Sequence, residues 1–309
     1  MYFDTSFYNS ANHRALLLGY ENPLLLRQRQ MLDARLYRSF HDHAAEIAYH
    51  EYVNGAALKY VRGAHSFQYE CAWREVLLAK NPTVAQFGDA GHTLKSSLRH
   101  QVLWDGRDSA ALPTQGAALS LTHELAGFGG NVQFLKHETA LQINVPLLPA
   151  LSFGVLAKFG ALAMPQWAGN RLSPSDRFYA GGPLSFAGFA KRGMGGGSTR
   201  RAQLGGTAHW SVLAMLSCPV QAFLSGGVGD GVDARLHCFA QVGALAQPRA
   251  GEWHALNSDL LTQYRTSVGV GVGFSLAGAR LELNASVPLR ASAYDRAETF
   301  QFGVAMKFI

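Results

Sequence analysis

The sequence predicts an all-β fold, a transmembrane antiparallel β-barrel of about 15 to 16 strands. Only 16% of the residues are charged, against about 25% in a typical soluble domain. No window offers the roughly 20 apolar residues of a transmembrane helix, because Pro146, Pro149 and Lys158 interrupt the best candidate, residues 145–165. Low charge, 33 glycines and long alternating runs together are typical of strands with one face in lipid.

The alternation of apolar and polar residues is clearest in the last two predicted strands. In residues 279–289, Leu281 and Leu283 fall on one face, while Glu282 and Asn284 fall on the other. In residues 299–309, every second residue from Phe300 to Phe308 is apolar. A period of two predicts strands with one apolar and one polar face.

The same template predicts thirteen earlier strands, which gives fifteen in all. They are residues 2–8, 13–20, 31–40, 44–53, 56–62, 64–78, 92–105, 116–124, 131–147, 151–165, 204–220, 236–247 and 264–277. Asn54-Gly55 and Glu21-Asn22-Pro23 are typical turn signals between strands. Many of the runs exceed the usual 5–6 residues of a soluble strand, as tilted strands crossing a bilayer must.

The longest predicted loop is the glycine-rich and aromatic stretch DRFYAGGPLSFAGFAKRGMGGG, residues 176–197. Its Arg177–Pro183 run, followed by Ala187-Gly188-Phe189, resembles the lid loop of the outer-membrane protein assembly family, also called the bacterial surface antigen family. Residues 91–119 resemble a strand–turn–strand of that family, with Asp105, Arg107, Pro113 and Gly116 in D-x-R…P-x-x-G spacing. Residues 122–147 and the two closing strands also resemble it, in collinear order over residues 24–309, and most closely in its mitochondrial branch, the barrel subunit of the sorting and assembly machinery.

The resemblance implies a sixteen-stranded barrel whose lid loop folds back into the lumen. It further implies insertion of unfolded β-barrel precursors into the mitochondrial outer membrane through a seam between the first and last strands. The implied partners are those precursors, accessory subunits of the assembly machinery and outer-membrane lipid. The implied site residues in the lid loop are Arg177, Phe178, Tyr179, Gly181, Gly182, Pro183, Gly188, Phe189 and Arg192. In the seam strand they are Gln301, Gly303, Met306 and Phe308, which fit the assembly signal of mitochondrial barrel substrates, and the turn residues are expected to shape the fold.

The chain departs from the family pattern at the tip of the lid loop. Ala187 stands where the family has an arginine, so the usual contact of that guanidinium with the barrel wall cannot form. Lys191 or Arg192 could substitute from a few residues away, although the two side chains differ in geometry and reach.

The whole chain, residues 1–309, is expected to be one outer-membrane barrel domain. The N-terminal polypeptide-transport-associated domain of the family and its first strand are expected to be missing, and a truncated gene model is the favoured explanation. No export signal or presequence is evident in the first residues.

Two other classes remain open: a porin-like metabolite or ion channel, and a soluble β-rich structural protein. Residues 193–201 lack the lysine of a phosphate loop, and residues 268–274 alternate like a strand rather than a dinucleotide-binding turn. The histidines of residues 41–46 and the three dispersed cysteines form no metal pattern. The sequence therefore predicts no enzyme, no cofactor, no metal site and no nucleic-acid partner.

Overall fold

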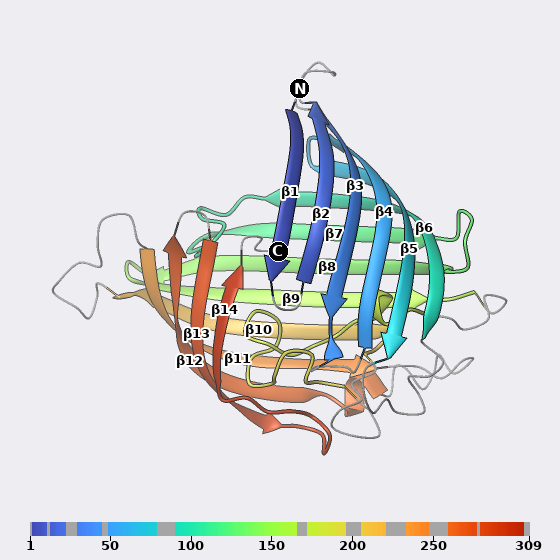
Figure 1. The fold of residues 1–309 in the computed structure, drawn as a ribbon. Helices are drawn as coiled ribbons and strands as arrows, with labels where there is room; N and C mark the ends of the chain where they lie inside the picture. The colour runs from blue at the N-terminus through green and yellow to red at the C-terminus, as the bar shows by residue number, and fades with distance from the viewer. Residues whose placement is uncertain are drawn as a thin grey trace. The chain divides into compact units, whose positions relative to one another are not determined.

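The computed structural model describes residues 30–44, 49–78, 90–165, 172–195, 205–220, 233–246, 259–276 and 279–305, together with the backbone of two N-terminal strands. The fold is all-β, as the sequence predicts (Figure 1). Its fourteen strands are hydrogen-bonded in sequence order, from β1 to β14. No helix in the described part of the chain is long and apolar enough to cross a membrane.

Most of the strands are long, and each lies next to its neighbour in sequence in the sheet. They are β1 (Tyr2–Ser10), β2 (His13–Asn22), β3 (Gln30–Asp42), β4 (Tyr49–Arg62), β5 (His65–Leu78), β6 (Gly91–Asp105), β7 (Gly116–Ala126), β8 (Phe134–Leu148), β9 (Leu151–Ala163), β10 (Ala208–Pro219), β11 (Asp233–Ala246), β12 (Arg265–Leu276), β13 (Ala279–Arg290) and β14 (Phe300–Ala305). A short 3₁₀ helix, η1 (Pro174–Asp176), lies in the connection between β9 and β10.

The described residues form fourteen strands, one fewer than the fifteen that the sequence pattern predicts. The predicted strands 44–53 and 56–62 are one strand, β4, and the expected turn at Asn54-Gly55 lies in its middle. Gly55 packs against the ring of Tyr37 on β3, where a Cβ would collide with the phenol. The glycine therefore makes room for a neighbouring side chain instead of forming a turn.

The two faces of the sheet have opposite character, as β6 illustrates. Leu94 and Leu98 are exposed on one face, while Lys95 and Ser97 are buried on the other. Because successive side chains of a strand point to opposite faces, the apolar face is the exposed one and the polar face is covered. This is the reverse of a soluble sheet and is typical of strands that contact lipid.

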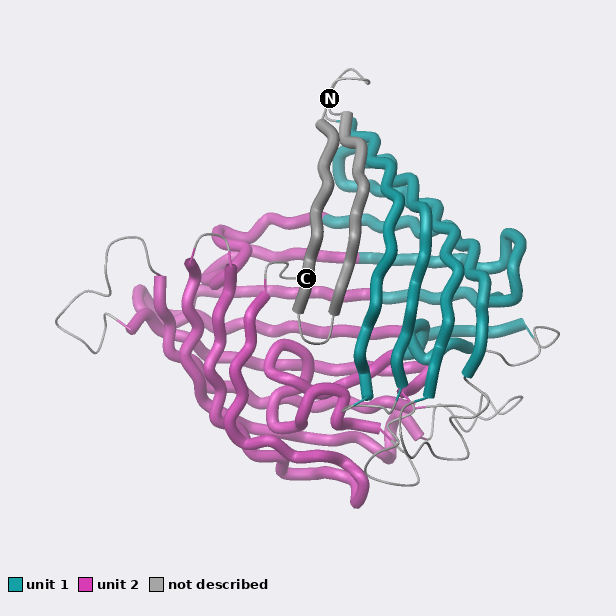
Figure 2. Tube along the Cα trace, viewed as in Figure 1, with its two compact units in different colours: residues 1–103, 121–138, 161–177 teal, residues 104–120, 139–160, 178–309 magenta. Residues whose placement is uncertain are grey.

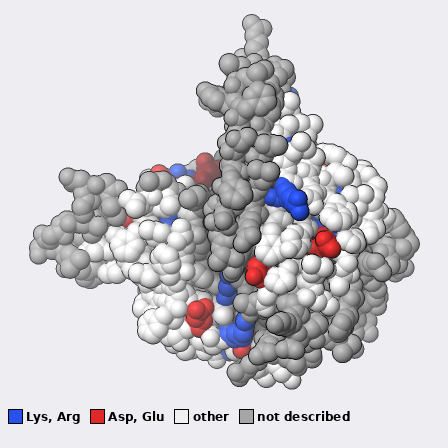
Figure 3. Space-filling model, viewed as in Figure 1, with Lys and Arg blue, Asp and Glu red and all other residues white. Residues whose placement is uncertain are grey.

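The chain forms two compact units (Figure 2). Unit 1 comprises residues 1–103, 121–138 and 161–177, and unit 2 comprises residues 104–120, 139–160 and 178–309. On the face drawn in Figure 3, the charged residues of the described part are scattered among uncharged ones. In unit 2, Phe186, Phe189 and Met194 form a buried cluster within the long loop.

Candidate functional site

The candidate site is the connection between β9 and β10 together with the last strand, β14. The connection has two parts. The root is residues 172–177 in unit 1, and the tip is residues 185–189 in unit 2. The root is ordered by the 3₁₀ turn of η1, which has a proline at its start, where the fixed φ of proline suits a helical turn. Arg177 closes the root by donating to the carbonyl oxygen of Leu172 at 3.1 Å.

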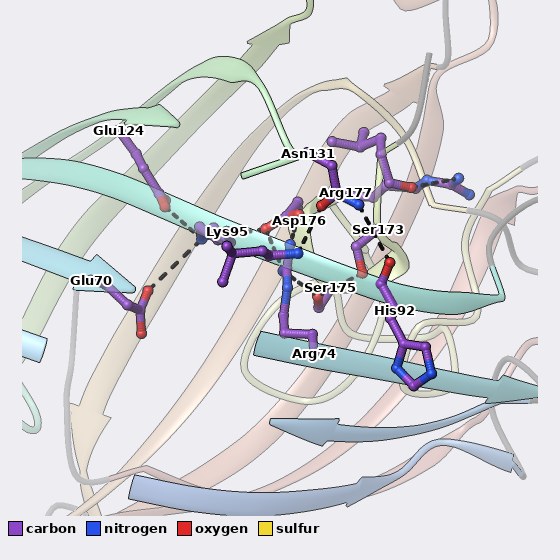
Figure 4. A network of polar contacts seen from close by, with 12 residues as sticks. Glu70, Arg74, His92, Lys95, Glu124, Asn131, Ser173, Ser175, Asp176 and Arg177 are labelled. Carbon is purple, nitrogen blue, oxygen red and sulfur yellow. Dashed lines mark hydrogen bonds and ion pairs between the residues drawn. The ribbon is translucent and has the colours of Figure 1, made fainter. Parts of the chain in front are cut away.

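Asp176 binds the root to the polar face of unit 1 through buried ion pairs (Figure 4). Its carboxylate accepts two hydrogen bonds from the guanidinium of Arg74 on β5, at 3.0 and 2.8 Å. The ammonium of Lys95 on β6 lies 3.4 Å away. Burial alone would raise the pKa of Asp176, but Arg74 and Lys95 hold it below its usual range. The root is therefore fixed by a carboxylate that stays ionised in the folded protein.

The charges around Asp176 continue across three strands. Lys95 also contacts Glu124 of β7 at 2.6 Å and Glu70 of β5 at 3.9 Å, and Arg99 contacts Glu124 at 2.9 Å. Because Lys95 lies among three carboxylates and Arg74 pairs with Asp176, the buried charges are largely compensated. The sequence analysis did not identify this network, although its strand members all occupy polar positions of alternating strands.

Two amide side chains hold the tip in unit 2. The side chain of Gln241 on β11 accepts a hydrogen bond from the Ala187 N–H at 3.2 Å and donates one to the Ser185 carbonyl oxygen at 2.8 Å. The side chain of Gln301 on β14 accepts from the Gly188 N–H at 2.9 Å and donates to the Phe189 carbonyl oxygen at 2.7 Å. The tip is thus bound through its backbone, by neutral groups.

Glycines permit the close backbone path of the loop. Gly181 has φ +111°, and a Cβ there would collide with the Ala190 carbonyl oxygen. Gly188 has φ +92°, and its Cβ would lie 3.1 Å from the Cβ of Ser267. Both positions are close approaches at positive φ, which is why glycine is required there. Gly182 also has a positive φ and donates to the Phe189 carbonyl oxygen at 2.8 Å.

The aromatic residues of the loop are packed in unit 2. Phe178 forms an edge contact with His209 of β10, with ring centroids 4.6 Å apart. Phe189 is fully buried and meets Phe186 edge-on at 5.5 Å. The ring of Tyr179 lies under the guanidinium of Arg192 at 4.7 Å.

The last strand and the loop contact each other directly in unit 2. Gly303 leaves space for Pro183 and Leu184, because a Cβ at Gly303 would lie 3.0 Å from Cγ atoms of both. Residues just before β14 add backbone hydrogen bonds, from Ala190 N–H to the Arg296 carbonyl oxygen and from Glu298 N–H to the Gly188 carbonyl oxygen, at 2.8 and 3.1 Å. Met306 and Phe308, which the resemblance also assigned to the seam strand, lie outside the described residues.

The contacts at Ala187 show what takes the place of an arginine at the tip. Gln241 and Gln301 bind the backbone on either side of the short Ala187 side chain. Arg192 stacks on Tyr179, and the Lys191 carbonyl oxygen accepts a hydrogen bond from Arg296 at 3.3 Å. The amides of β11 and β14 hold the tip, where the family has an arginine and where Lys191 or Arg192 was only a possible substitute.

The predicted turn motif forms a compact structural turn in unit 2. Asp105 and Arg107 make a two-bonded ion pair at 2.9 and 2.7 Å, and Arg107 also donates to Gln142 of β8 at 2.6 Å. Pro113 is buried. Gly116 has φ +96° beside the backbone of Gly106, where a Cβ would collide. These contacts shape the turn between β6 and β7 and join it to β8.

A sheet of long sequential antiparallel strands, with an apolar exposed face and a structured loop on its polar face, defines the class of outer-membrane β-strand proteins. The chain belongs to the Omp85 superfamily, whose domain model matches residues 2–308. This confirms the family resemblance of the sequence.

Curated relatives and solved structures agree with that membership. The chain is 37% identical over 254 residues to the sorting and assembly machinery component 50 homolog B of Xenopus laevis, and 36% identical over 252 residues to its human homolog. Each match covers 80% of this chain and 53% of the relative, so the chain spans about half the length of these relatives. A SAM50-like protein of Schizosaccharomyces pombe is 27% identical over 98% of this chain and 64% of its own length.

The fold resembles that of BamA from Haemophilus ducreyi lacking POTRA domains 1–3. The TM-score is 0.77 at 16% sequence identity, covering 95% of this chain and 62% of that one. CdiB from Escherichia coli is less similar, with a TM-score of 0.55 at 11% identity over 95% of this chain and 53% of its own. At these identities the likeness concerns the fold alone.

Proposed function

We propose that this chain inserts and assembles β-barrel precursor proteins in the mitochondrial outer membrane. The observation that carries the proposal is the pair of hydrogen bonds between Gln301 of the last strand and the tip of the long loop. The names of the relatives refer to a sorting and assembly machinery, which supports the same activity. The proposed partners are unfolded barrel precursors, accessory assembly subunits and membrane lipid, and we expect no catalytic chemistry.

The edge of β14 is the proposed contact for an incoming strand. β14 is last in the sheet order and pairs with β13, over six residues within the part of the chain that the structure describes. A strand at the end of the sheet order presents backbone N–H and C=O groups that another chain can pair with. The precursor would add a strand to β14 by backbone hydrogen bonds, and β14 would move to admit it.

The loop is proposed to report or restrain that movement. Gln301 and Gly303 both face loop residues, so displacement of β14 breaks the amide bonds to Gly188 and Phe189 and separates Gly303 from Pro183. The seam-strand residues and the lid-loop residues would thus move together.

The test is depletion of the protein followed by re-expression of variants and native-gel assembly of a labelled mitochondrial porin precursor. We expect depletion to leave precursor import intact and to block formation of the mature complex. Gln301→Leu is expected to restore assembly poorly, whereas Gln263→Leu, which removes an exposed amide bonded to Asp259, is expected to restore it fully.

The rival function, an outer-membrane channel, predicts a different result. Normal porin assembly after depletion, together with a loss of metabolite flux and a large stable conductance of the purified protein in planar bilayers, would contradict the insertion proposal. Defective assembly without such a conductance would support it.

A further inference from the structure

Four histidines from four consecutive strands of unit 1 form a continuous row. They are His65 on β5, His100 on β6, His123 on β7 and His137 on β8. Neighbouring ring centroids in this histidine row are 5.4, 6.3 and 4.6 Å apart. The function proposed above does not use any of these residues.

The histidine row lies on the exposed apolar face of the sheet. By strand alternation, His100 shares its face with the exposed Leu94 and Leu98, and His123 shares its face with the exposed Leu125. Phe67 stacks on His100 with ring centroids 4.5 Å apart. All four imidazoles are exposed or half-exposed, so they face the surroundings of the sheet and not its covered polar side.

Within the row, ring nitrogens approach each other in two pairs. Nδ1 of His65 lies 3.1 Å from Nε2 of His100, and Nδ1 of His137 lies 3.2 Å from Nδ1 of His123. Two imidazole nitrogens bound to one ion at about 2.0–2.1 Å, at angles near 90–110°, are about 2.9–3.4 Å apart. Both pairs therefore already have the separation of two adjacent ligands on one metal ion.

We propose that each pair of the histidine row binds one divalent transition-metal ion of the Cu²⁺ or Zn²⁺ class. Imidazole nitrogen is a preferred ligand of both ions, and Cu²⁺ stands highest in the affinity order of such sites. The described residues contain no group of three or more histidine, cysteine or acidic side chains placed to hold an ion. Each site therefore has two protein ligands, and water or lipid headgroup oxygens complete the coordination.

The same nitrogen–nitrogen distances also fit an N–H···N hydrogen bond within each pair. Experiment distinguishes a hydrogen-bonded pair from a metal-binding pair. A metal ion would take the place of the shared proton, which moves to the other nitrogen of its own imidazole, and would join adjacent strands, β5 to β6 and β7 to β8. The sequence did not indicate these sites because the paired histidines are 35 and 14 residues apart. Only the sheet register brings them together.

The experiment is a Cu²⁺ titration of the whole chain, purified without a histidine tag and placed in lipid nanodiscs, read by electron paramagnetic resonance. We expect saturable binding with nitrogen coupling from two imidazoles per ion, and competition by Zn²⁺. His100→Gln and His123→Gln are each expected to remove one site. Even loss of residues behind the ligands typically weakens metal binding about 10–100-fold, so a lost ligand should weaken its site at least about tenfold.

Two further variants and a control guard against effects on folding. His65→Gln and His137→Gln remove the opposite member of each pair and are expected to give the same losses. His92→Gln, which changes a histidine stacked on Trp73 outside the row, is expected to bind like the wild type. No saturable binding in nanodiscs, or unchanged binding in His100→Gln/His123→Gln, would overturn the proposal and leave the pairs as hydrogen bonds.

Discussion

The root and the tip of the long loop are fixed by opposite kinds of chemistry. At the root, one carboxylate, Asp176, is held by two buried cations, Arg74 and Lys95. At the tip, the uncharged amides of Gln241 and Gln301 bind the backbone from Ser185 to Phe189. A buried ion pair is costly to break on one side, whereas each neutral hydrogen bond contributes only about 1 kcal/mol. We infer that the root is the permanent attachment and the tip the part that can be released.

The largest expected effect is loss of the root carboxylate. Asp176→Ala leaves Arg74 and Lys95 buried without this partner, and breaking a buried pair in this way costs about 3–5 kcal/mol. We expect a matching drop in the free energy of unfolding, measured by urea titration in vesicles. Asp233→Ala is the matched control, since Asp233 is an exposed carboxylate at the start of β11.

A double substitution sharpens the same prediction. Arg74→Met with Asp176→Leu replaces the pair by apolar side chains, which often costs little, so it is expected to recover most of the lost stability. A double variant as unstable as Asp176→Ala would mean that the root depends on Arg74 for something other than the ion pair.

A smaller effect is expected at the tip. Gln301→Leu leaves the Gly188 N–H without its partner, at a cost of about 1–3 kcal/mol for an unsatisfied group. The Phe189 carbonyl oxygen loses one hydrogen bond but keeps the one from the Gly182 N–H. Hydrogen exchange of the tip amides is expected to accelerate, while that of the root stays unchanged. Equal acceleration at root and tip would contradict the idea that the two attachments are independent.

Acid is expected to affect the root and not the tip. The folded-state pKa of Asp176 lies below its usual value, so its stabilisation is fully present above the unfolded pKa of about 3.9. That stabilisation is lost as the pH falls through the lower, folded-state pKa. Proteolysis of the root should therefore increase only below about pH 4, and Asp176→Asn should abolish this pH dependence.

The smallest effect is expected at Arg192, which has φ +53° and stacks on Tyr179. Arg192→Gly removes a cation–π contact of about 1–2 kcal/mol at a half-buried site but also relieves a left-handed backbone, a gain of about 1–2 kcal/mol. The two changes nearly cancel, so the urea midpoint should hardly move. A large loss would show that Arg192 carries part of the attachment.

The sequence by itself determined the strands and the family. Alternation in residues such as Leu281–Glu282–Leu283 depends only on the two-residue period of a strand, so it is visible without a structure. The glycine pattern of the loop was also informative, because positive φ at Gly181 and Gly188 is a local demand of the backbone. Asn54-Gly55 shows where prediction from local sequence fails. Its glycine leaves space for the ring of Tyr37 on the neighbouring strand and does not form a turn.

Only the tertiary structure decided which side chains meet. Arg74 and Asp176 are 102 residues apart and Gly188 and Gln301 are 113 apart, and no local pattern encodes such pairs. The same holds for the histidine row, whose members occupy unremarkable positions of four separate strands. The histidine contacts follow from the register between strands, and the loop contacts follow from the position of the loop on the polar face. Register is set by how the side chains of each strand pack on the two faces of the sheet.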